Sequence, residues 1–399
     1  MAQGPTRCPR WHTLLVAALA VAVAAFLSVA VVGHGFFDLW IYHGALRHWA
    51  HDGGELYDWI RPNSRYGFTY PPFAALVLLP IAYLPWPVVV VLVVAATITA
   101  GVLLLTWLVD PISRRMRWNR RSALAVTLCL AAAFEPMRET VDFGQINVLV
   151  LLLVVADLRR PVANGRQWAG IGIGLATAIK LTPGIFVGYL LITGRWRPAL
   201  AAAGTAIAAT LIAAAVAPDA SREFWTAALW NTDRVGELDF ISNQSLRGLL
   251  ARLDPPAASG WWLGLVAGTL TVWAWRTRAA VAAGEEMTGV ALTGVVMCLI
   301  SPVTWVHHLV WLIPALLLLV DKALRPAVSR RRRRLLLGLA IVMYTLLTSR
   351  LVWYWEYGAE GIAGLLAGNT YVWVSLALLV ALPVRAADSA GRSSVTPVG

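Results

Sequence analysis

Long apolar stretches alternate with short, arginine-rich polar stretches along this chain, and several apolar stretches have the length that crosses a bilayer. A membrane-spanning helix needs about 20 consecutive, mostly apolar residues, and residues 14–32, 86–109 and 199–217 each meet that requirement. Shorter apolar stretches recur through the rest of the chain, so the pattern predicts about twelve spans in all. The predicted spans are 14–32, 86–109, 122–135, 143–157, 169–181, 183–193, 199–217, 259–275, 287–303, 307–320, 335–349 and 369–383.

Two longer polar segments, 33–70 and 218–260, are rich in Trp, Tyr, Asp, Asn and Arg. Apolar residues recur at about 3.6-residue spacing between residues 36 and 49, which predicts a helix lying in the membrane interface. Residues 72–84 predict a short helix that dips or packs without crossing. The expected architecture is a single all-α membrane domain over residues 1–384, roofed by the two polar segments. The small, polar tail, residues 385–399, is expected to be disordered and cytoplasmic.

The composition also indicates a membrane protein. Of the 399 residues, 59% are apolar and 14% are charged, whereas soluble domains are about 45–50% apolar and about 25% charged. The three cysteines show no disulfide or zinc spacing, so they carry no redox signal.

The positive charges lie between the apolar stretches and predict an orientation. The net charge is +12, and arginine carries nearly all of the positive charge, because Lys180 and Lys322 are the two lysines. Short loops rich in Lys and Arg face the cytoplasm, which predicts a multi-pass plasma-membrane protein with both termini cytoplasmic. The arginine run 330–334 is expected to contact anionic membrane lipids. No readout module accompanies the basic residues, so nucleic-acid binding is not expected.

Five polar motifs interrupt the apolar background, and in this orientation all five lie at or near the outer face. They are 38–42, 66–72, 135–147, 178–183, and the pair 242–245 with 301–308. A purely structural role does not require them to share one face. A carboxylate, cationic donors and amides on one membrane face favour glycosyl transfer from a lipid-linked donor.

Asp38 and Lys180, two charged residues in these motifs, each have a structural and a chemical explanation. Asp38 follows the first span, where partial burial raises a carboxyl pKa and suits a general base. Aspartate is also a favoured residue at helix N-caps. Lys180 lies in an apolar stretch, where a charge is costly and usually functional, but a lysine can also reach the surface by snorkelling.

The neutral residues of these motifs also have both a chemical and a structural explanation. Gln145 and Asn147 can hydrogen-bond a sugar or join helices. Tyr70 precedes two prolines that start a helix well. His307 and His308 can donate to phosphate or sugar oxygens or pack at the interface, and adjacent histidines on a helix are poor joint metal ligands.

Taken in order, these motifs resemble glycosyltransferase family 87, actinobacterial polyprenol-phosphate-sugar-dependent transferases with the GT-C membrane fold. The resemblance covers residues 37 to 308. It implies an α-1,2-mannosyltransferase that takes mannose from polyprenyl-phosphate mannose. The implied acceptors are mannosylated lipids or lipoglycans, namely phosphatidylinositol mannosides, lipomannan or lipoarabinomannan, at the outer face of the plasma membrane. Some members of the family transfer arabinofuranose, so an arabinofuranosyltransferase is the alternative.

The resemblance also implies roles for individual residues. In such enzymes the acid after the first span is the catalytic base, and Asp38 matches that position. A β-linked mannosyl phosphate attacked once gives an α product, which requires one base and not the close carboxylate pair of a retaining enzyme. The donor phosphate is expected to contact Lys180, His307 and His308. The residues expected to contact the sugar or acceptor are Tyr42, Tyr70, Gln145, Asn147, Asn243, Gln244 and Trp305.

No cofactor is expected. The chain has no DxD motif of the kind that binds nucleotide sugars, which is consistent with a lipid-linked donor. A metal is not obviously required, although Asp52, Glu55 and Asp58 could bind one.

A secondary transporter is the alternative from another class of protein, since many-span proteins with broken helices often transport. Transporters tend to have paired repeats and charges at the bilayer midplane. This chain shows no internal repeat, and its polar motifs gather toward one face. The pattern therefore favours an enzyme.

Overall fold

The computed structural model describes residues 10–30, 33–231, 234–253, 258–356 and 361–384. Within these ranges the regular structure is helical, apart from a single bridge between Ile60 and Gly67. The predicted tail 385–399 lies outside the described residues. The α-helices are α1 (Arg10–Ala30), α2 (Phe37–His51), α3 (Pro72–Leu78), α4 (Trp86–Met116), α5 (Arg120–Ala133), α6 (Glu135–Asp142), α7 (Asn147–Asp157), α8 (Ile171–Ile179), α9 (Ile185–Ile192), α10 (Trp196–Val216), α11 (Pro218–Glu223), α12 (Leu246–Leu253), α13 (Ala258–Ala282), α14 (Glu286–Ile300), α15 (Ile313–Ala323), α16 (Arg330–Leu346), α17 (Gly361–Gly368) and α18 (Thr370–Ala381).

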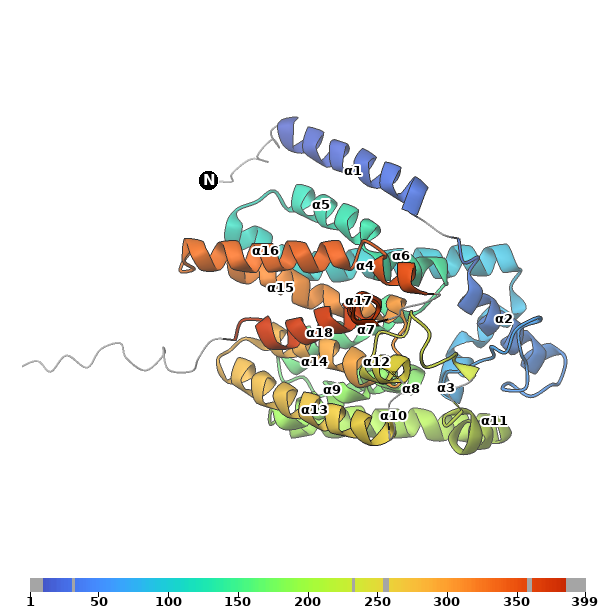
Figure 1. Ribbon diagram of the computed structural model, residues 1–399. Coiled ribbons are helices and arrows are strands. Elements are labelled where there is room, and N and C mark those ends of the chain that lie inside the picture. Colours follow the sequence, from blue (N-terminus) through green and yellow to red (C-terminus); the bar gives the residue numbers. More distant parts are fainter. Residues whose placement is uncertain (1–9, 31–32, 232–233, 254–257, 357–360, 385–399) are drawn as a thin grey trace, which may run out of the picture.

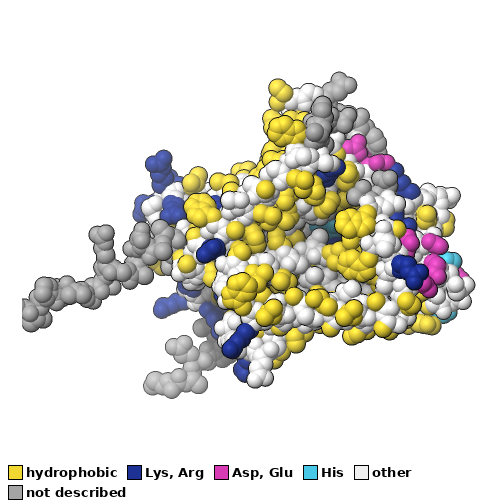
Figure 2. Space-filling view, turned by 90° about the horizontal axis from the view of Figure 1, so that it is seen from below, with side chains coloured by type: hydrophobic (Ala, Val, Ile, Leu, Met, Phe, Trp, Pro, Cys, Tyr) yellow, Lys and Arg dark blue, Asp and Glu magenta, His cyan; other side chains and the backbone are white. Residues whose placement is uncertain are grey.

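The long helices run roughly side by side as a bundle (Figure 1). Helices α2, α3 and α11 gather at one end, which we call the roof end, and the start of α1 and the end of α18 lie at the opposite end. The two predicted roof segments are in contact there, because Arg65 pairs with Glu237 and the Tyr57 and Phe224 rings pack at 5.8 Å. On the face in Figure 2, hydrophobic side chains cover the middle and Lys and Arg gather toward the end opposite the roof.

The chain is an all-helical membrane protein, but its helices differ in their capacity to cross a bilayer. In the described residues four helical stretches are long and apolar enough: Thr13–Ala30, Trp86–Met116, Trp196–Val216 and Val306–Ala323. Two bent helix pairs raise the number to six if each pair is one span. The other predicted spans mostly coincide with shorter helices, so the count of about twelve crossings stays a prediction.

The chain bends by 115° between α6 and α7, and here the structure corrects the sequence-based boundaries. Residues 135–142 were expected as an outer turn before a span at 143–157, but they form α6, and α7 begins only at Asn147. The extended backbone at Phe134 ends α5, and Pro136 in the first turn favours the start of α6. At the bend Gly144 has a φ of 68°, and a Cβ there would lie 2.5 Å from the Cβ of Leu39. Only glycine therefore lets α2 approach the bend this closely.

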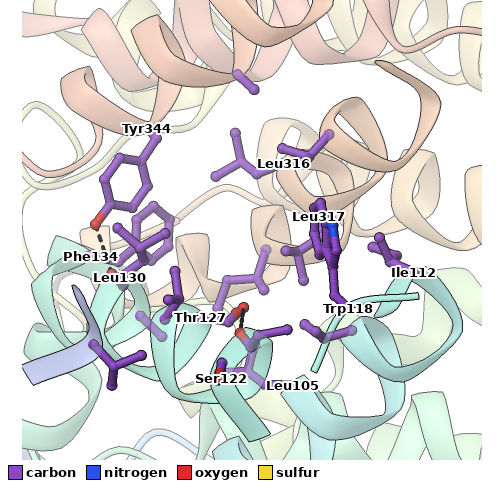
Figure 3. A pocket seen from close by; sticks show the side chains of 18 of the residues that line it. Leu105, Ile112, Trp118, Ser122, Thr127, Leu130, Phe134, Leu316, Leu317 and Tyr344 are labelled. Atoms are coloured by element: carbon purple, nitrogen blue, oxygen red, sulfur yellow. Dashed lines mark hydrogen bonds between the residues drawn. The ribbon is translucent and has the colours of Figure 1, made fainter. Parts of the chain in front are cut away.

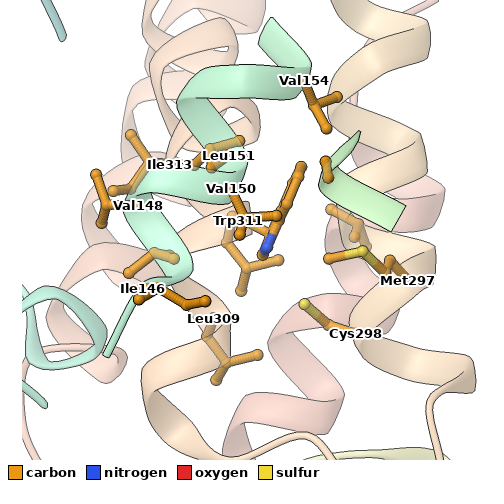
Figure 4. Close-up of a cluster of buried hydrophobic side chains, with 14 of the residues drawn as sticks. Ile146, Val148, Val150, Leu151, Val154, Met297, Cys298, Leu309, Trp311 and Ile313 are labelled. Carbon is orange, nitrogen blue, oxygen red and sulfur yellow. The ribbon is translucent and has the colours of Figure 1, made fainter. Parts of the chain in front are cut away.

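Two further interruptions carry predicted site residues. Helix α8 ends at Ile179, Lys180 is extended at φ −147°, and a short 3₁₀ turn containing Pro183 leads into α9. His307 and His308 lie in η6 (Val306–Leu312), the 3₁₀ segment that precedes α15. Beneath these breaks, apolar side chains of α7, α14 and η6–α15 converge in the core (Figure 4). The core therefore holds the α6–α7 bend, the α8–α9 break and the 3₁₀ segment η6 next to one another.

An apolar cavity of about 620 Å³ lies between α1, α4, α5, α15 and α16 (Figure 3). Its lining includes Leu105, Phe134, Leu316 and Tyr344, and the Tyr344 hydroxyl donates to the backbone oxygen of Leu130. None of the site residues predicted from the sequence lines this cavity.

Candidate active site

Asp38 lies in the first turn of α2 without capping it. The cap position is Phe36, which has a left-handed backbone and no side-chain capping bond. The start of α2 is held instead by the α6–α7 bend, because the Phe36 and Leu39 amides donate to the backbone oxygens of Asp142 and Phe143. The structural explanation for Asp38 as a helix cap is therefore not supported.

A closed ring of hydrogen bonds holds the Asp38 carboxylate. The Gln145 amide nitrogen donates to Asp38 Oδ2 at 2.6 Å and to the Tyr42 hydroxyl at 2.9 Å. Tyr42 donates to the Tyr70 hydroxyl at 3.0 Å, and Tyr70 donates to Gln145 Oε1 at 2.6 Å. Tyr42, Tyr70 and Gln145 are buried and Asp38 is half-buried. The ring fixes one carboxylate oxygen, while Oδ1 has no hydrogen-bond partner in the described ranges.

The environment of Asp38 suits proton abstraction near neutral pH. Burial raises the pKa of the Asp38 carboxyl to about 6, against the opposing effects of the Gln145 hydrogen bond and the charges of Lys180, His34 and Arg61. A general base works best when its pKa lies near the operating pH. The carboxylate is thus a stronger base than a solvated aspartate and is still ionised at pH 7.

Lys180 extends from the α8–α9 break into the same cluster. Its ammonium donates to Asn147 Oδ1 at 2.6 Å and lies 3.4 Å from the Tyr70 hydroxyl and 3.1 Å from His308 Nε2. Lys180 thus points to polar groups inside the protein and does not snorkel to a surface. A cavity of about 10 Å³, enough for about one water, adjoins Asn147, Lys180 and His308.

The tautomer of His308 follows from its backbone contact. The Trp305 amide donates to His308 Nδ1 at 3.2 Å, so a neutral His308 carries its proton on Nε2. That N–H faces the Lys180 ammonium, which is also a donor. Two donors this close together lack an acceptor, and an anionic oxygen placed beside the pair, within hydrogen-bond distance of both nitrogens, would satisfy them.

The other predicted site residues at this break have different surroundings. The His307 backbone oxygen accepts from Asn147 at 3.1 Å, and its ring packs on Phe143 at 5.2 Å. Its buried Nε2 has no hydrogen-bond partner in the described part of the chain. Trp305 packs edge-on against Phe240 at 6.0 Å. The structure therefore brings Asp38, Tyr42, Tyr70, Gln145, Asn147, Lys180 and His308 into one connected cluster, with His307 and Trp305 adjoining it.

Asn243 and Gln244 are engaged by the backbone instead. Asn243 donates to the oxygens of Leu238 and Pro302 and accepts from the Thr304 amide at 2.9 Å. Gln244 donates to the oxygens of Ile241 and Gly368 and accepts from the Tyr371 amide at 3.1 Å. Both residues are fully buried, so their amides have little capacity left for a sugar.

Replacing Asn243 with Ala is therefore expected to lower stability and not substrate affinity. The change leaves buried backbone groups of Leu238, Pro302 and Thr304 without partners, which costs about 1–3 kcal/mol. Thermal unfolding of the purified variant should show the loss, while KM for the sugar donor stays at the wild-type value. A raised KM with an unchanged unfolding temperature would instead support a sugar-binding role for Asn243.

Several polar residues near the site were given no role from the sequence, including Glu135 of the 135–147 motif. The His34 ring stacks on Phe143 at 4.2 Å, and its Nε2 lies 3.3 Å from the Glu139 carboxylate. Glu135 is buried and accepts hydrogen bonds from Trp353 and Tyr371. The partners are more than 200 residues away from Glu135, so no local pattern indicates this role. The only feature of the sequence that indicates such residues is the high density of polar residues in 33–70 and 135–147.

The acidic residues considered for a metal do not form a ligand set. In the described residues no group of three or more His, Cys, Asp or Glu side chains is arranged to hold a metal ion. The Asp52 carboxylate is exposed and lies 3.5 Å from the ring of His48.

Comparisons with known proteins agree on one family. The model described as "Glycosyltransferase family 87" matches residues 68–302. The chain is similar to a polyprenol-phosphate-mannose-dependent alpha-(1-2)-phosphatidylinositol mannoside mannosyltransferase of Mycolicibacterium smegmatis, with 34% identity over 86% of this chain and 83% of that protein.

Two further relatives differ in the acceptor or the sugar. A polyprenol-phosphate-mannose-dependent alpha-(1-2)-phosphatidylinositol pentamannoside mannosyltransferase of Mycolicibacterium smegmatis is 32% identical over 86% of this chain and 82% of that protein. An alpha-(1->3)-arabinofuranosyltransferase of Corynebacterium glutamicum is 27% identical over 69% of this chain and 68% of that protein. No solved structure matches the chain.

Proposed function

Because this chain belongs to glycosyltransferase family 87, we propose that it is an inverting α-1,2-mannosyltransferase that moves mannose from polyprenyl-phosphate mannose to a mannosylated lipid. The two mannosyltransferases similar over most of their length carry the mannose donor and a phosphatidylinositol mannoside acceptor in their names. The arabinofuranosyltransferase is more distant and matches less of the chain. The phosphatidylinositol mannosides are therefore the acceptor class proposed here, ahead of lipomannan and lipoarabinomannan.

One observation carries the mechanism: a carboxylate with a free oxygen lies in the same cluster as two facing N–H donors. Asp38 Oδ1 removes the proton from an acceptor hydroxyl as that oxygen attacks the anomeric carbon. The new bond joins the acceptor oxygen to the anomeric carbon, and the bond from that carbon to the phosphate oxygen breaks. The electron pair leaves with the polyprenyl phosphate, and the configuration inverts.

Lys180 and His308 stabilise the departing phosphate. Donors already aimed at the position where negative charge develops need no reorganisation during the reaction, which makes them effective. The Lys180 ammonium and the His308 Nε2–H meet at 3.1 Å, and a phosphate oxygen is the acceptor that this arrangement lacks. The Tyr42–Tyr70–Gln145 ring keeps Asp38 oriented, and Asn147 orients Lys180.

The arginine-rich end of the bundle supports an orientation with cytoplasmic termini and the site at the outer face. The run 330–334 begins α16 at the end opposite the roof. A lipid-linked donor and a glycolipid acceptor both keep their sugars at the membrane surface, and the Asp38 cluster lies beside the roof end, where such head groups enter.

The proposed activity predicts a specific product in a reconstituted assay. Purified protein in liposomes should transfer mannose from polyprenyl-phosphate mannose to phosphatidylinositol mannosides, and linkage analysis should find a terminal α-1,2 bond. Polyprenyl-phosphate arabinose serves as the competing donor, and protein-free liposomes as the control. Transfer of arabinose alone would identify an arabinofuranosyltransferase, and sugar uptake without a new glycosidic bond would indicate a transporter.

A further inference from the structure

Arg61 is held at the mouth of the Asp38 cluster by a short hairpin of the roof. Ile60 pairs with Gly67, and the Arg61 amide donates to the Tyr66 oxygen at 2.9 Å. Within the turn, the Ser64 hydroxyl donates to the Arg61 backbone oxygen at 2.8 Å. The hairpin thus fixes the backbone from which the Arg61 side chain extends.

The Arg61 guanidinium stacks on the two aromatic residues that flank Asp38 and Leu39. Its central carbon lies 3.9 Å from the centroid of the Phe37 ring and 4.5 Å from that of Trp40. Such contacts are favourable and orient the planar group. The stack places a permanent positive charge over the first turn of α2, where it interacts electrostatically with the Asp38 carboxylate without a direct ion pair among the described residues.

Arg61 differs from Arg65 and Arg234, two other arginines of the roof, in having free donors. Arg65 pairs with Glu237, and Arg234 donates to the Tyr57 backbone oxygen. The Arg61 side chain has neither a carboxylate nor a hydrogen-bond partner within the described ranges. Five N–H donors held in a fixed plane match the oxygens of a phosphate better than any single hydroxyl.

We propose that Arg61 binds the phosphodiester of a lipid substrate as its head group approaches the first turn of α2. The proposal rests on the proposed function, in which the donor and the phosphatidylinositol-type acceptor each contain one phosphodiester. Arg61 recognises and positions the substrate, whereas Lys180 and His308 act on the leaving phosphate deeper in the cluster. Phe37 and Trp40 orient the guanidinium through their ring contacts.

Arg61→Gln is expected to raise KM for the phosphate-bearing substrate about 10- to 100-fold, because a charge-assisted hydrogen bond is lost. The kcat at saturation should change little, and Arg61→Lys should recover part of the affinity because it keeps the charge but not the planar fork. Arg65→Gln is the matched control, since it removes an exposed arginine from the same hairpin. Thermal unfolding of all variants checks that the roof stays folded.

The substrates used in the assay identify which phosphodiester is bound. A rise in KM for polyprenyl-phosphate mannose assigns the donor. A rise for phosphatidylinositol mannoside, without a change for a phosphate-free alkyl mannoside, assigns the acceptor. Unchanged KM for both lipids, an equal rise for the phosphate-free acceptor, or the same effect in Arg65→Gln would each overturn the proposal.

Binding without turnover separates this proposal from the proposed function. Polyprenyl phosphate and phosphatidylinositol mannoside should each be tested for a rise in the unfolding temperature of the wild-type protein, and Arg61→Gln should weaken the response to the lipid it recognises. A wild-type protein that binds these lipids through Arg61 but transfers no mannose contradicts the proposed function alone. An active enzyme whose lipid binding does not depend on Arg61 contradicts this inference alone.

Discussion

Asp38→Asn is expected to lower the rate of mannose transfer about 10²–10⁴-fold, the contribution typical of a positioned general base. Asparagine keeps the size of the side chain and an acceptor for the Gln145 amide, but it cannot remove a proton. The measurement is the initial rate with saturating donor and acceptor in liposomes. Asp219→Asn provides the control, because this exposed acid on α11 contacts only Arg222 in the described ion pairs. Wild-type rates in Asp38→Asn would refute the role of base.

The pH profile gives a second test of the same residue. Burial raises the pKa of the Asp38 carboxyl to about 6, and only the deprotonated form acts as a base. The rate should therefore reach a plateau above about pH 7 and fall about tenfold for each pH unit well below 6. Asp38→Asn should abolish this acidic limb. A wild-type profile that stays flat down to pH 5 would exclude a base with this pKa.

Lys180→Met is expected to lower kcat about 10²–10³-fold, the effect of removing one preorganised donor from a developing anion. The partners within hydrogen-bond distance are Asn147, Tyr70 and His308, none of which is a carboxylate. Loss of this half-buried charge should therefore not unfold the protein. The measurement is single-turnover transfer from polyprenyl-phosphate mannose, which separates chemistry from product release.

The other lysine of the chain offers a matched contrast. Lys322 is also buried, but it pairs with Glu285 at 2.5 Å, and Asp321 and Arg325 adjoin this pair. Lys322→Met should lower the unfolding temperature and leave the single-turnover rate near the wild-type value, because removing one partner of a buried ion pair destabilises the fold. Equal losses of rate in the two variants would indicate that Lys180 acts only through stability.

The positions of the breaks were partly predictable from the sequence. Pro183 after Lys180 indicated an interrupted helix, and α8 does end at Ile179. The expected outer turn at 135–142 was wrong, because these residues form α6 and both Glu135 and Glu139 are buried in it. Their burial depends on partners such as Trp353 and Arg350, which come from the other end of the sequence.

Candidate residues with the same side-chain chemistry could be assigned different roles only from the three-dimensional structure. Gln145 and Gln244 are both amides in polar motifs of the predicted outer face. Gln145 donates a hydrogen bond to the Asp38 carboxylate, whereas Gln244 donates to the backbone oxygens of Ile241 and Gly368. Residue type and hydropathy do not distinguish a side chain that faces a substrate from one that joins two loops. The charged residues were more informative, because a buried Lys180 needs polar neighbours wherever it lies.

Because side chains do not fill the apolar cavity beside α1, the surrounding lipid or detergent must complete the packing of this part of the protein. Protein cores are close-packed, yet about 620 Å³ between α1 and the bundle is not filled by side chains, and the apolar window of α1 has no buried residues. In a bilayer the alkyl tails of neighbouring lipids complete this packing, and in a micelle the detergent must do so. The length and branching of the alkyl chains of the surrounding lipid or detergent therefore affect the packing of α1, as core substitutions affect packing in a soluble protein. At the end of α1, the Ala30 carbonyl accepts hydrogen bonds from Arg138 and Arg350.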